Sequence, residues 1–219
     1  MPKPVTIADV QRALAGARPG PVAQGRMAPQ PRVGQETYFN PPPNCRQGSV
    51  LILLYPRAGQ LHLVLTRRTD RVRHHKGQVS LPGGAQLPGE PLVQTALREA
   101  GEELGIPTRD IQVLGGLTPL YVPVSGYCIH PFVGFLAVAP LLRPDPIEVA
   151  EVLEVTLDEL LDPAARHVEL WKDPQLSSRR IPCFHLRGWV VWGATAMILS
   201  ELSAMLEAEN AAADGCSCI

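Results

Sequence analysis

Three carboxylates are concentrated in the segment "REAGEEL", residues 98–104. If the segment is helical, Glu99, Glu102 and Glu103 fall at i, i+3 and i+4 on one face, and like charges there cost roughly 0.2–0.5 kcal/mol per pair. Arg98 lies four residues before Glu102 and offsets one charge. Hard divalent cations would offset the rest, because Mg²⁺ prefers carboxylate oxygens and completes its shell with water and substrate phosphate. A solvated acidic helix face is the alternative.

The flanking residues predict a helix from about residue 91 to 104. Pro91 suits the first helical turn, and Gly105 suits the C-terminal cap. One apolar stripe recurs at i, i+4, i+7 and i+11: Val93, Leu97, Ala100 and Leu104. At about 100° per residue, the carboxylates lie on the opposite side. The helix is therefore expected to pack by the stripe and to present a carboxylate ridge.

A loop rich in proline and glycine, "LPGGAQLPGE" (81–90), opens directly onto this helix. Adjacent glycines let the backbone approach a ligand closely. Glu90, at the start of the helix, suits the positive end of the helix dipole. The loop and the carboxylates together favour a metal-binding unit over a solvated face.

Residues 84–106 resemble the signature of the Nudix hydrolase family at every defining position: Gly84, five residues, Glu90, seven residues, then "REAGEELGI". The resemblance implies an α/β/α sandwich around a mixed β-sheet. It also implies Mg²⁺- or Mn²⁺-dependent hydrolysis of a nucleoside diphosphate linked to a second moiety. The implied metal ligands are Glu99, Glu102, Glu103 and the backbone carbonyl of Gly84. Glu90 and Arg98 would form a structural ion pair that holds the loop to the helix.

A basic run, "RRTDRVRHHK" (67–76), precedes the loop. A solvated hairpin loop is one interpretation. A pocket for an anionic substrate is the other, since the planar fork of arginine suits phosphate. The adjacent His74 and His75 lack the i, i+4 spacing of a helical zinc site. The cations expected to contact substrate are Arg67, Arg68, Arg73 and Lys76.

The wider segment 65–84 is similar to the additional motif of coenzyme A diphosphatases within that family. The matching residues are Leu65, Thr66, Arg68, Arg73, Gly77, Pro82, Gly83 and Gly84. Thr69 departs from the usual Ser or Ala, and Leu81 departs from the usual Phe. "WGATAMIL" (192–199) resembles the start of the last helix of that subfamily, and the whole resemblance covers about residues 48–205.

This second resemblance implies cleavage of coenzyme A to 4′-phosphopantetheine and adenosine 3′,5′-bisphosphate. We expect the basic run to bind the 3′-phosphate, with Arg73 as the first candidate. Glu102 is the expected proton acceptor, and Glu148 or Glu151 from a later loop is the alternative. Two rival functions remain: a Nudix hydrolase for ADP-ribose or a dinucleoside polyphosphate, and a non-catalytic Nudix-type ligand sensor.

The chain of 219 residues is 45% hydrophobic and carries a net charge of −1, which suits a globular domain and favours neither nucleic acid nor an anionic membrane as partner. Its five cysteines are scattered without CxxC spacing and predict a reducing compartment rather than a disulfide framework. The start lacks the apolar core of a signal peptide, and no apolar stretch is long enough to span a bilayer. We therefore expect a cytoplasmic protein, with its oligomeric state open.

The chain divides into an N-terminal helix with a proline-rich arm (1–47), a Nudix domain (48–208) and a polar tail (209–219). The proline-rich part, residues 17–44, is expected to be extended rather than helical. Strands are predicted at 50–56, 61–68, 111–117, 131–139 and 181–186. Helices are predicted at 6–15, 91–104, 158–161 and 192–209. Their interleaving favours a mixed sheet with helices on both faces.

Overall fold

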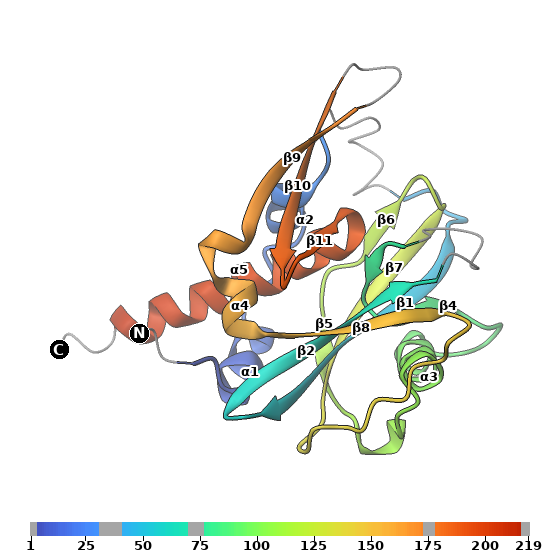
Figure 1. The fold of residues 1–219 in the computed structure, drawn as a ribbon, viewed down its shortest axis with the longest axis horizontal. Helices are drawn as coiled ribbons and strands as arrows, with labels where there is room; N and C mark the ends of the chain where they lie inside the picture. The colour runs from blue at the N-terminus through green and yellow to red at the C-terminus, as the bar shows by residue number, and fades with distance from the viewer. Residues whose placement is uncertain (1–3, 31–40, 70–76, 173–177, 216–219) are drawn as a thin grey trace.

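The computed structural model describes residues 4–30, 41–69, 77–172 and 178–215, and contains two β-sheets (Figure 1). The larger sheet has eight strands in the order β3-β2-β1-β7-β5, with β4 also on β1, β6 on β7 and β8 on β2. The pair β1–β7 is parallel and β1–β2 is antiparallel, so the sheet is mixed. The smaller sheet is antiparallel, in the order β11-β10-β9.

The strands of the larger sheet are β1 Arg46–Arg57, β2 Gln60–Arg68, β3 Val79–Ser80, β4 Gly83–Ala85, β5 Gln112–Gly116, β6 Leu120–Val122, β7 Tyr127–Phe135 and β8 Val149–Thr156. Those of the smaller sheet are β9 Arg166–Trp171, β10 Arg179–Leu186 and β11 Trp189–Trp192. The helices are α1 Ile7–Ala15, α2 Gly20–Gln24, α3 Leu92–Leu104, α4 Leu157–Leu161 and α5 Gly193–Gly215. Short 3₁₀ turns occupy Gly25–Met27, Thr108–Asp110 and Pro163–Ala165.

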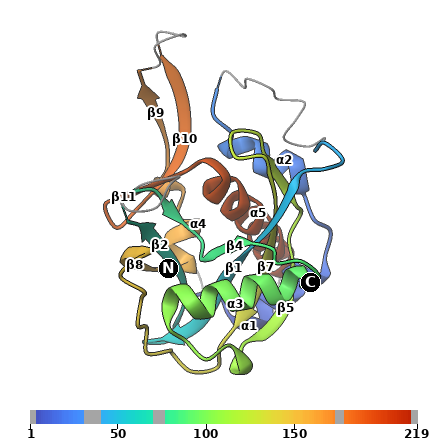
Figure 2. The same cartoon turned by 90° about the vertical axis from the view of Figure 1, so that its right-hand side faces the viewer.

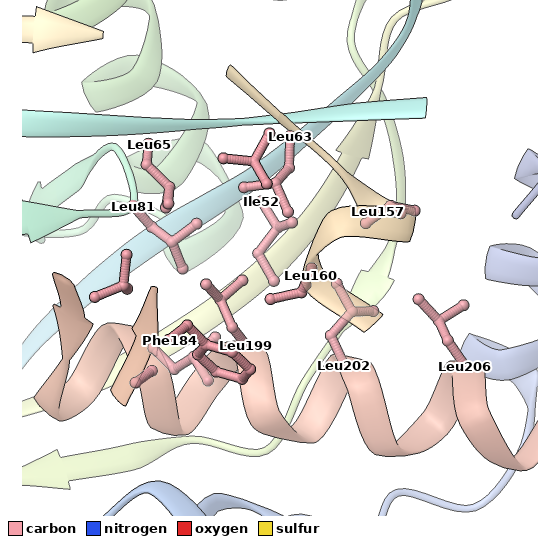
Figure 3. Packing of buried hydrophobic residues seen from close by; sticks show 14 of the residues in the cluster. Ile52, Leu63, Leu65, Leu81, Leu157, Leu160, Phe184, Leu199, Leu202 and Leu206 are labelled. Carbon is pink, nitrogen blue, oxygen red and sulfur yellow. The ribbon is translucent and has the colours of Figure 1, made fainter. Parts of the chain in front are cut away.

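Helices cover both faces of the larger sheet (Figure 2). Successive residues of β1 point to opposite faces, so Leu51 and Leu53 pack toward α3 while Ile52 packs toward α5. Leu199 and Leu202 of α5 lie against the sheet on that second face (Figure 3). Because β1 is buried on both faces, its sequence reads as one continuous apolar run. The predicted mixed α/β architecture is confirmed.

The N-terminal segment differs from the expected extended arm. Residues 20–24 form α2, and residues 25–27 form a 3₁₀ turn. Pro19 and Pro21 fall at the start of α2, where the missing N–H of proline leaves no helical hydrogen bond unmade. The prediction failed because proline content excludes only helix interiors.

Strand and helix ends also differ from the sequence-based expectation. β3, β4, β6, β8, β9 and β11 were not predicted, and β7 ends at Phe135 rather than at 139. Helix α5 continues to Gly215, past residue 208 where the sequence placed the end of the domain. Among the described residues, no helix is long and apolar enough to cross a membrane.

Cys45 and Cys128 form a disulfide, although the sequence predicted none. The two residues are separated by 83 positions, and the parallel pairing of β1 with β7 brings them together. Spacing along the chain therefore could not reveal this bond, and the expectation of reduced cysteines was wrong for this pair. Cys183 is free and buried.

Candidate active site

Helix α3 begins and ends where its sequence predicted. Pro91 is its N-terminal flanking residue, and Gly105 caps the C-terminus with a left-handed φ of 64°. A Cβ at Gly105 would lie 2.3 Å from the carbonyl oxygen of Arg143, so a side chain there is excluded. The same end of the helix is tied to a later loop, because the Asp145 amide donates to the Glu103 carbonyl at 3.0 Å.

The three carboxylates of α3 differ in burial, contrary to the predicted solvent-facing ridge. The side chain of Glu102 is 62% exposed, that of Glu99 is 17% exposed and that of Glu103 is 4% exposed. The helix packs against β1 and β4, and these cover the side that carries Glu99 and Glu103. The helical repeat predicted the angular positions of the three carboxylates around α3. It could not predict that β4 would cover two of them.

The loop backbone approaches the α3 carboxylates closely at Gly84. A Cβ at Gly84 would lie 2.4 Å from Glu99 Oε2, so a side chain there would displace the Glu99 carboxylate. The neighbouring Gly83 N–H donates to Glu103. Gly83 itself has a positive φ of 154°, and a Cβ on it would lie 2.2 Å from the Ser49 carbonyl oxygen. The two glycines thus let β4 run against both the helix and β1.

Arg98 contacts all the nearby acids except Glu103. Its Nε lies 2.8 Å from Glu90 Oε1, and its Nη1 lies 2.9 Å from Glu99 Oε1 and 3.1 Å from Glu102 Oε2. Its Nη2 also donates to the Ala85 carbonyl at 3.1 Å. The hydrogen bonds that Glu90 accepts from Arg98, and next from the Thr95 hydroxyl, lower the pKa of Glu90 to about 2. Arg98 therefore joins loop to helix and offsets more of the ridge than the single pair expected from sequence.

Glu103 is the least compensated of the three carboxylates. Burial raises its pKa to about 8, even though Arg68 opposes the shift. Its Oε2 atom is buried and has no hydrogen-bond partner among the described residues. A buried carboxylate oxygen without a partner is costly unless a cation binds it. The chemistry of the donors fits a divalent cation, since carboxylate oxygens are the ligands that such ions prefer, and Glu99 lies against the Gly84 backbone.

Arg68 and Glu148 complete this cluster from outside the helix. Arg68 Nη1 lies 3.7 Å from Glu103 Oε1, and its Nη2 lies 3.7 Å from Glu148 Oε2. Burial raises the pKa of Glu99, with Glu102 and Glu148 adding to the shift and Arg98 opposing it. Glu148 is thus a carboxylate that the fold brings to the α3 site from 45 residues beyond Glu103.

The turn that carries Glu148 is fixed by its neighbours. Thr69 donates its hydroxyl to the Ile147 carbonyl at 2.7 Å, and its amide donates to the Glu148 carbonyl at 3.0 Å. Asp145 Oδ1 accepts from the Ile147 amide at 2.8 Å. Thr69, a departure from the motif in the sequence, therefore supplies a hydrogen bond that Ala could not.

The other sequence-predicted residues lie elsewhere. Arg67 Nη2 pairs with Glu151 Oε1 at 2.5 Å, and its guanidinium lies 5.1 Å from the Trp189 ring centroid. Arg67 and Glu151 therefore pair with each other rather than with the α3 cluster. Arg73 and Lys76 lie outside the described residues.

One further group of potential metal ligands occurs within the described residues. Ligand atoms of Glu169, Cys183 and His185 lie within 4.8 Å of one another on the smaller sheet. Glu169 already accepts hydrogen bonds from His185 Nε2 at 2.9 Å and from Trp171 Nε1 at 2.6 Å. Both oxygens of the Glu169 carboxylate therefore already accept a hydrogen bond, so we assign Glu169, Cys183 and His185 a structural role.

The chain is similar in sequence to known proteins. Residues 46–173 match the NUDIX domain. The chain is 36% identical to "Uncharacterized Nudix hydrolase NudL" of Photorhabdus laumondii subsp. laumondii over 173 residues, or 76% of this chain and 91% of that protein. It is 39% identical to the protein of the same description from Pectobacterium atrosepticum over 161 residues, covering 72% and 81% respectively.

Solved structures with a similar fold are more distant. A NUDIX hydrolase from Nitrosomonas europaea is 19% identical with a TM-score of 0.46, and the match covers 75% of this chain and 71% of that one. The Ap4A hydrolase of C. elegans, also 19% identical with a TM-score of 0.46, matches over 54% and 85%. Likeness at this level says nothing about substrate.

Proposed function

This chain belongs to the Nudix hydrolase family, and we propose that it hydrolyses the diphosphate of coenzyme A to 4′-phosphopantetheine and adenosine 3′,5′-bisphosphate. The observation that carries the proposal is the position of Arg68. This arginine belongs to the motif that resembles coenzyme A diphosphatases, and it lies 3.7 Å from Glu103 of the α3 cluster. The substrate motif and the metal-binding signature therefore meet at one place.

Nudix enzymes use divalent metals, and we propose Mg²⁺ or Mn²⁺ here. Glu99, Glu102 and Glu103 would hold the ion, with the Gly84 carbonyl as a further ligand. When bound, the ion would neutralise charge on the diphosphate and lower the pKa of water. The fit rests on the orphaned Glu103 Oε2 atom and on the close approach of Gly84 to Glu99.

The remaining side chains would orient the substrate and accept a proton. Arg68 would donate to a phosphate oxygen, because its planar fork lies at the edge of the cluster. Glu102 stays our proposed proton acceptor, and Glu148 is the competing candidate. Glu148 is half-exposed, lies beside Arg68 and has no role in holding the loop to α3. Glu151 is a weaker candidate because it pairs with Arg67.

A cytoplasmic location is part of the proposal and has one observation against it. The Cys45–Cys128 disulfide favours a compartment that is not strongly reducing. Alkylation of thiols in cell lysate, followed by mass spectrometry of the Cys45 and Cys128 peptides, distinguishes a reducing cytoplasm from a compartment that is not strongly reducing. Alkylated peptides would support the cytoplasm, and disulfide-linked peptides would contradict it.

The decisive experiment is mass spectrometry of products from a panel of diphosphates with Mg²⁺ or Mn²⁺. The panel contains coenzyme A, dephospho-coenzyme A, ADP-ribose and diadenosine tetraphosphate. We expect the highest kcat/KM for coenzyme A, with 4′-phosphopantetheine among the products, and no turnover by Glu103→Gln. A higher kcat/KM for ADP-ribose or the dinucleotide would contradict the substrate, and no turnover of any compound would favour a ligand sensor.

A further inference from the structure

Glu148 belongs to a short turn, residues 145–148, that lies between the C-terminal end of α3 and the end of β2. The Asp145 amide donates to the Glu103 carbonyl at 3.0 Å, which ties the first residue of the turn to α3. The last residue of the turn carries the carboxylate that lies 3.7 Å from Arg68 Nη2. The backbone of this turn therefore decides where the Glu148 carboxylate lies relative to the carboxylates of α3.

The pairing of β2 with β8 is irregular next to this turn. Arg67 pairs with Glu151, but the following residue, Arg68, pairs with Val149, so β8 carries one extra residue at this point. Such a bulge disrupts the hydrogen-bond ladder locally, and bulges are frequent next to active sites because they redirect side chains. The residues that precede Val149 therefore need hydrogen bonds other than the regular ladder to hold them against β2.

Thr69 supplies two such hydrogen bonds. Its amide donates to the Glu148 carbonyl at 3.0 Å, and its hydroxyl donates to the Ile147 carbonyl at 2.7 Å. Thr69 is only 9% exposed, so water has little access to replace the hydroxyl. Any residue with a backbone N–H can make the first bond, but the second requires the hydroxyl of Thr or Ser.

The backbone of Arg68 is held in a different way. Its amide donates to the Gln78 carbonyl at 3.1 Å, and its carbonyl accepts from the Gly77 amide at 3.1 Å. Neither hydrogen bond involves the turn 145–148. Loss of the Thr69 hydroxyl should therefore displace Glu148 and leave the backbone of Arg68 in place.

We infer that Thr69 is a positioning residue for the reaction and that its hydroxyl acts through Glu148. The inference rests on the proposed function, in which Glu148 is one of two candidates for accepting a proton, and it gives the Glu148 carboxylate a part in the reaction. Displacing a reacting group by about 1 Å can cost roughly a hundredfold in rate. A carboxylate does not attract an anionic diphosphate, so the displacement should lower kcat and leave KM nearly unchanged.

The first test uses two substitutions of Thr69 with coenzyme A and Mg²⁺. Thr69→Val keeps the shape but removes the hydroxyl, and should lower kcat by roughly tenfold to a hundredfold. Thr69→Ser keeps the hydroxyl and should restore most of this loss. Thr156→Val is the matched control, because the buried Thr156 donates its hydroxyl to Glu159 Oε2 at 3.0 Å, at the start of α4. This control should melt at a lower temperature and keep near-normal kcat per folded molecule.

A double-mutant cycle with Glu148→Gln distinguishes positioning from general support of the fold. Glu148→Gln keeps the backbone carbonyl that accepts from Thr69, so the turn retains its hydrogen bonds. If Thr69 acts through the Glu148 carboxylate, Thr69→Val should lower kcat far less in the Glu148→Gln background than in the wild type. Equal fold-losses in the two backgrounds would overturn the inference. A normal kcat in Thr69→Val, a loss shared by Thr69→Ser, or a change in KM alone would also overturn it.

Hydrogen exchange without turnover separates this inference from the proposed function. The Glu148 and Val149 amides both donate to the Asp145 carbonyl, at 3.2 and 2.8 Å. In metal-free Thr69→Val they should exchange roughly threefold to tenfold faster, which corresponds to the loss of one neutral hydrogen bond. Thr69→Ser and Thr156→Val should leave this exchange unchanged. Unchanged exchange in Thr69→Val would overturn the inference whatever the substrate is.

The remaining outcomes concern the substrate. If exchange accelerates and the cycle shows coupling on ADP-ribose or diadenosine tetraphosphate instead of coenzyme A, the substrate assignment is wrong and the role of Thr69 stands. If exchange accelerates but none of these compounds is cleaved, the proposed function is overturned, and Thr69 then only holds the turn.

Discussion

Two buried glutamates, Glu103 on α3 and Glu201 on α5, sit in opposite electrostatic environments. Glu201 is fully buried and accepts from the Gly20 amide, the Gln24 amide group and both the amide and hydroxyl of Thr118. Glu103 is nearly as buried but has one oxygen without a partner and an arginine at 3.7 Å. The saturated carboxylate of Glu201 joins elements of the fold, whereas the unsaturated one of Glu103 is where we propose that a cation binds.

From this contrast we expect Glu201 to contribute mainly to the stability of the protein and Glu103 mainly to its activity. The hydrogen bonds of Glu201 connect α5 to α2 and to the segment after β5. Glu103 has one oxygen without a hydrogen-bond partner, so we expect it to contribute little to the stability of the metal-free protein. The following experiments either strengthen this division or break it.

The largest expected effect is on the turnover of Glu103→Gln. Loss of one cation ligand should lower kcat by about three orders of magnitude or more, since charge stabilisation is usually the largest catalytic contribution. The metal-free melting temperature should stay unchanged or rise slightly, because a repulsive charge is removed. Steady-state kinetics and metal-free calorimetry measure the two quantities. Glu209→Gln, which alters a carboxylate paired with Arg12 of α1, is the control and should keep near-normal turnover.

The second effect concerns the stability of Glu201→Gln. The amide places two donors where the protein presents donors, so we expect a loss of about 2–4 kcal/mol in the free energy of unfolding. Turnover per folded molecule should change little. Urea unfolding measures the loss, and Glu207→Gln, on the same helix but 37% exposed, should lose far less. Equal stability losses in the two variants would show that saturation of the carboxylate does not matter.

Arg98→Ala should lower both turnover and stability, whereas Glu103→Gln should lower turnover alone and Glu201→Gln stability alone. It removes the link between Glu90 and the helix, so the metal-free protein should lose roughly 1–3 kcal/mol. Activity should also fall because the loop at Gly84 is no longer held against α3. Arg109→Ala is a suitable control, since Arg109 is 86% exposed and its ion pair with Asp110, at 3.7 Å, is with its neighbour in the chain. If Arg98→Ala and Glu103→Gln melt alike without metal, the assignment of Arg98 to structure is wrong.

A further expected effect is a pH dependence of metal-free stability. The pKa of Glu103 rises from 4.5 to about 8 on folding, so the native state binds more protons than the unfolded chain between these values. Stability should therefore be greatest near pH 4.5 and should fall, by up to a few kcal/mol at ~1.4 kcal/mol per pKa unit, as pH rises toward 8. The raised pKa of Glu99 acts in the same direction.

Thermal melting from pH 5 to 8 in a chelating buffer tests this slope. Glu103→Gln should show a flatter dependence than the wild type over that range. Saturating Mg²⁺ should reduce or reverse the wild-type slope, because the ion binds the deprotonated carboxylate. A wild type whose stability rises over this interval without metal would contradict the burial of an uncompensated Glu103.

The local sequence determined helix α3, its ends and the identity of its acids. Pro91 and Gly105 act on the backbone of their immediate neighbours, and the spacing of Glu99, Glu102 and Glu103 follows from the helical repeat alone. The Gly84-to-Ile106 pattern was specific enough to identify the family. All of these features depend on contacts within about one or two helical turns, which is why they can be read from the chain.

Tertiary structure decided which of those acids is buried and what lies opposite it. Glu148 reaches Arg68 through the β2–β8 pairing, and Cys45 meets Cys128 through the β1–β7 pairing. The contact of Thr69 with the turn that carries Glu148 likewise exists only once the end of β2 lies beside the start of β8. Each of these contacts joins segments many residues apart. Their positions follow from strand register and packing, which no short spacing in the sequence encodes.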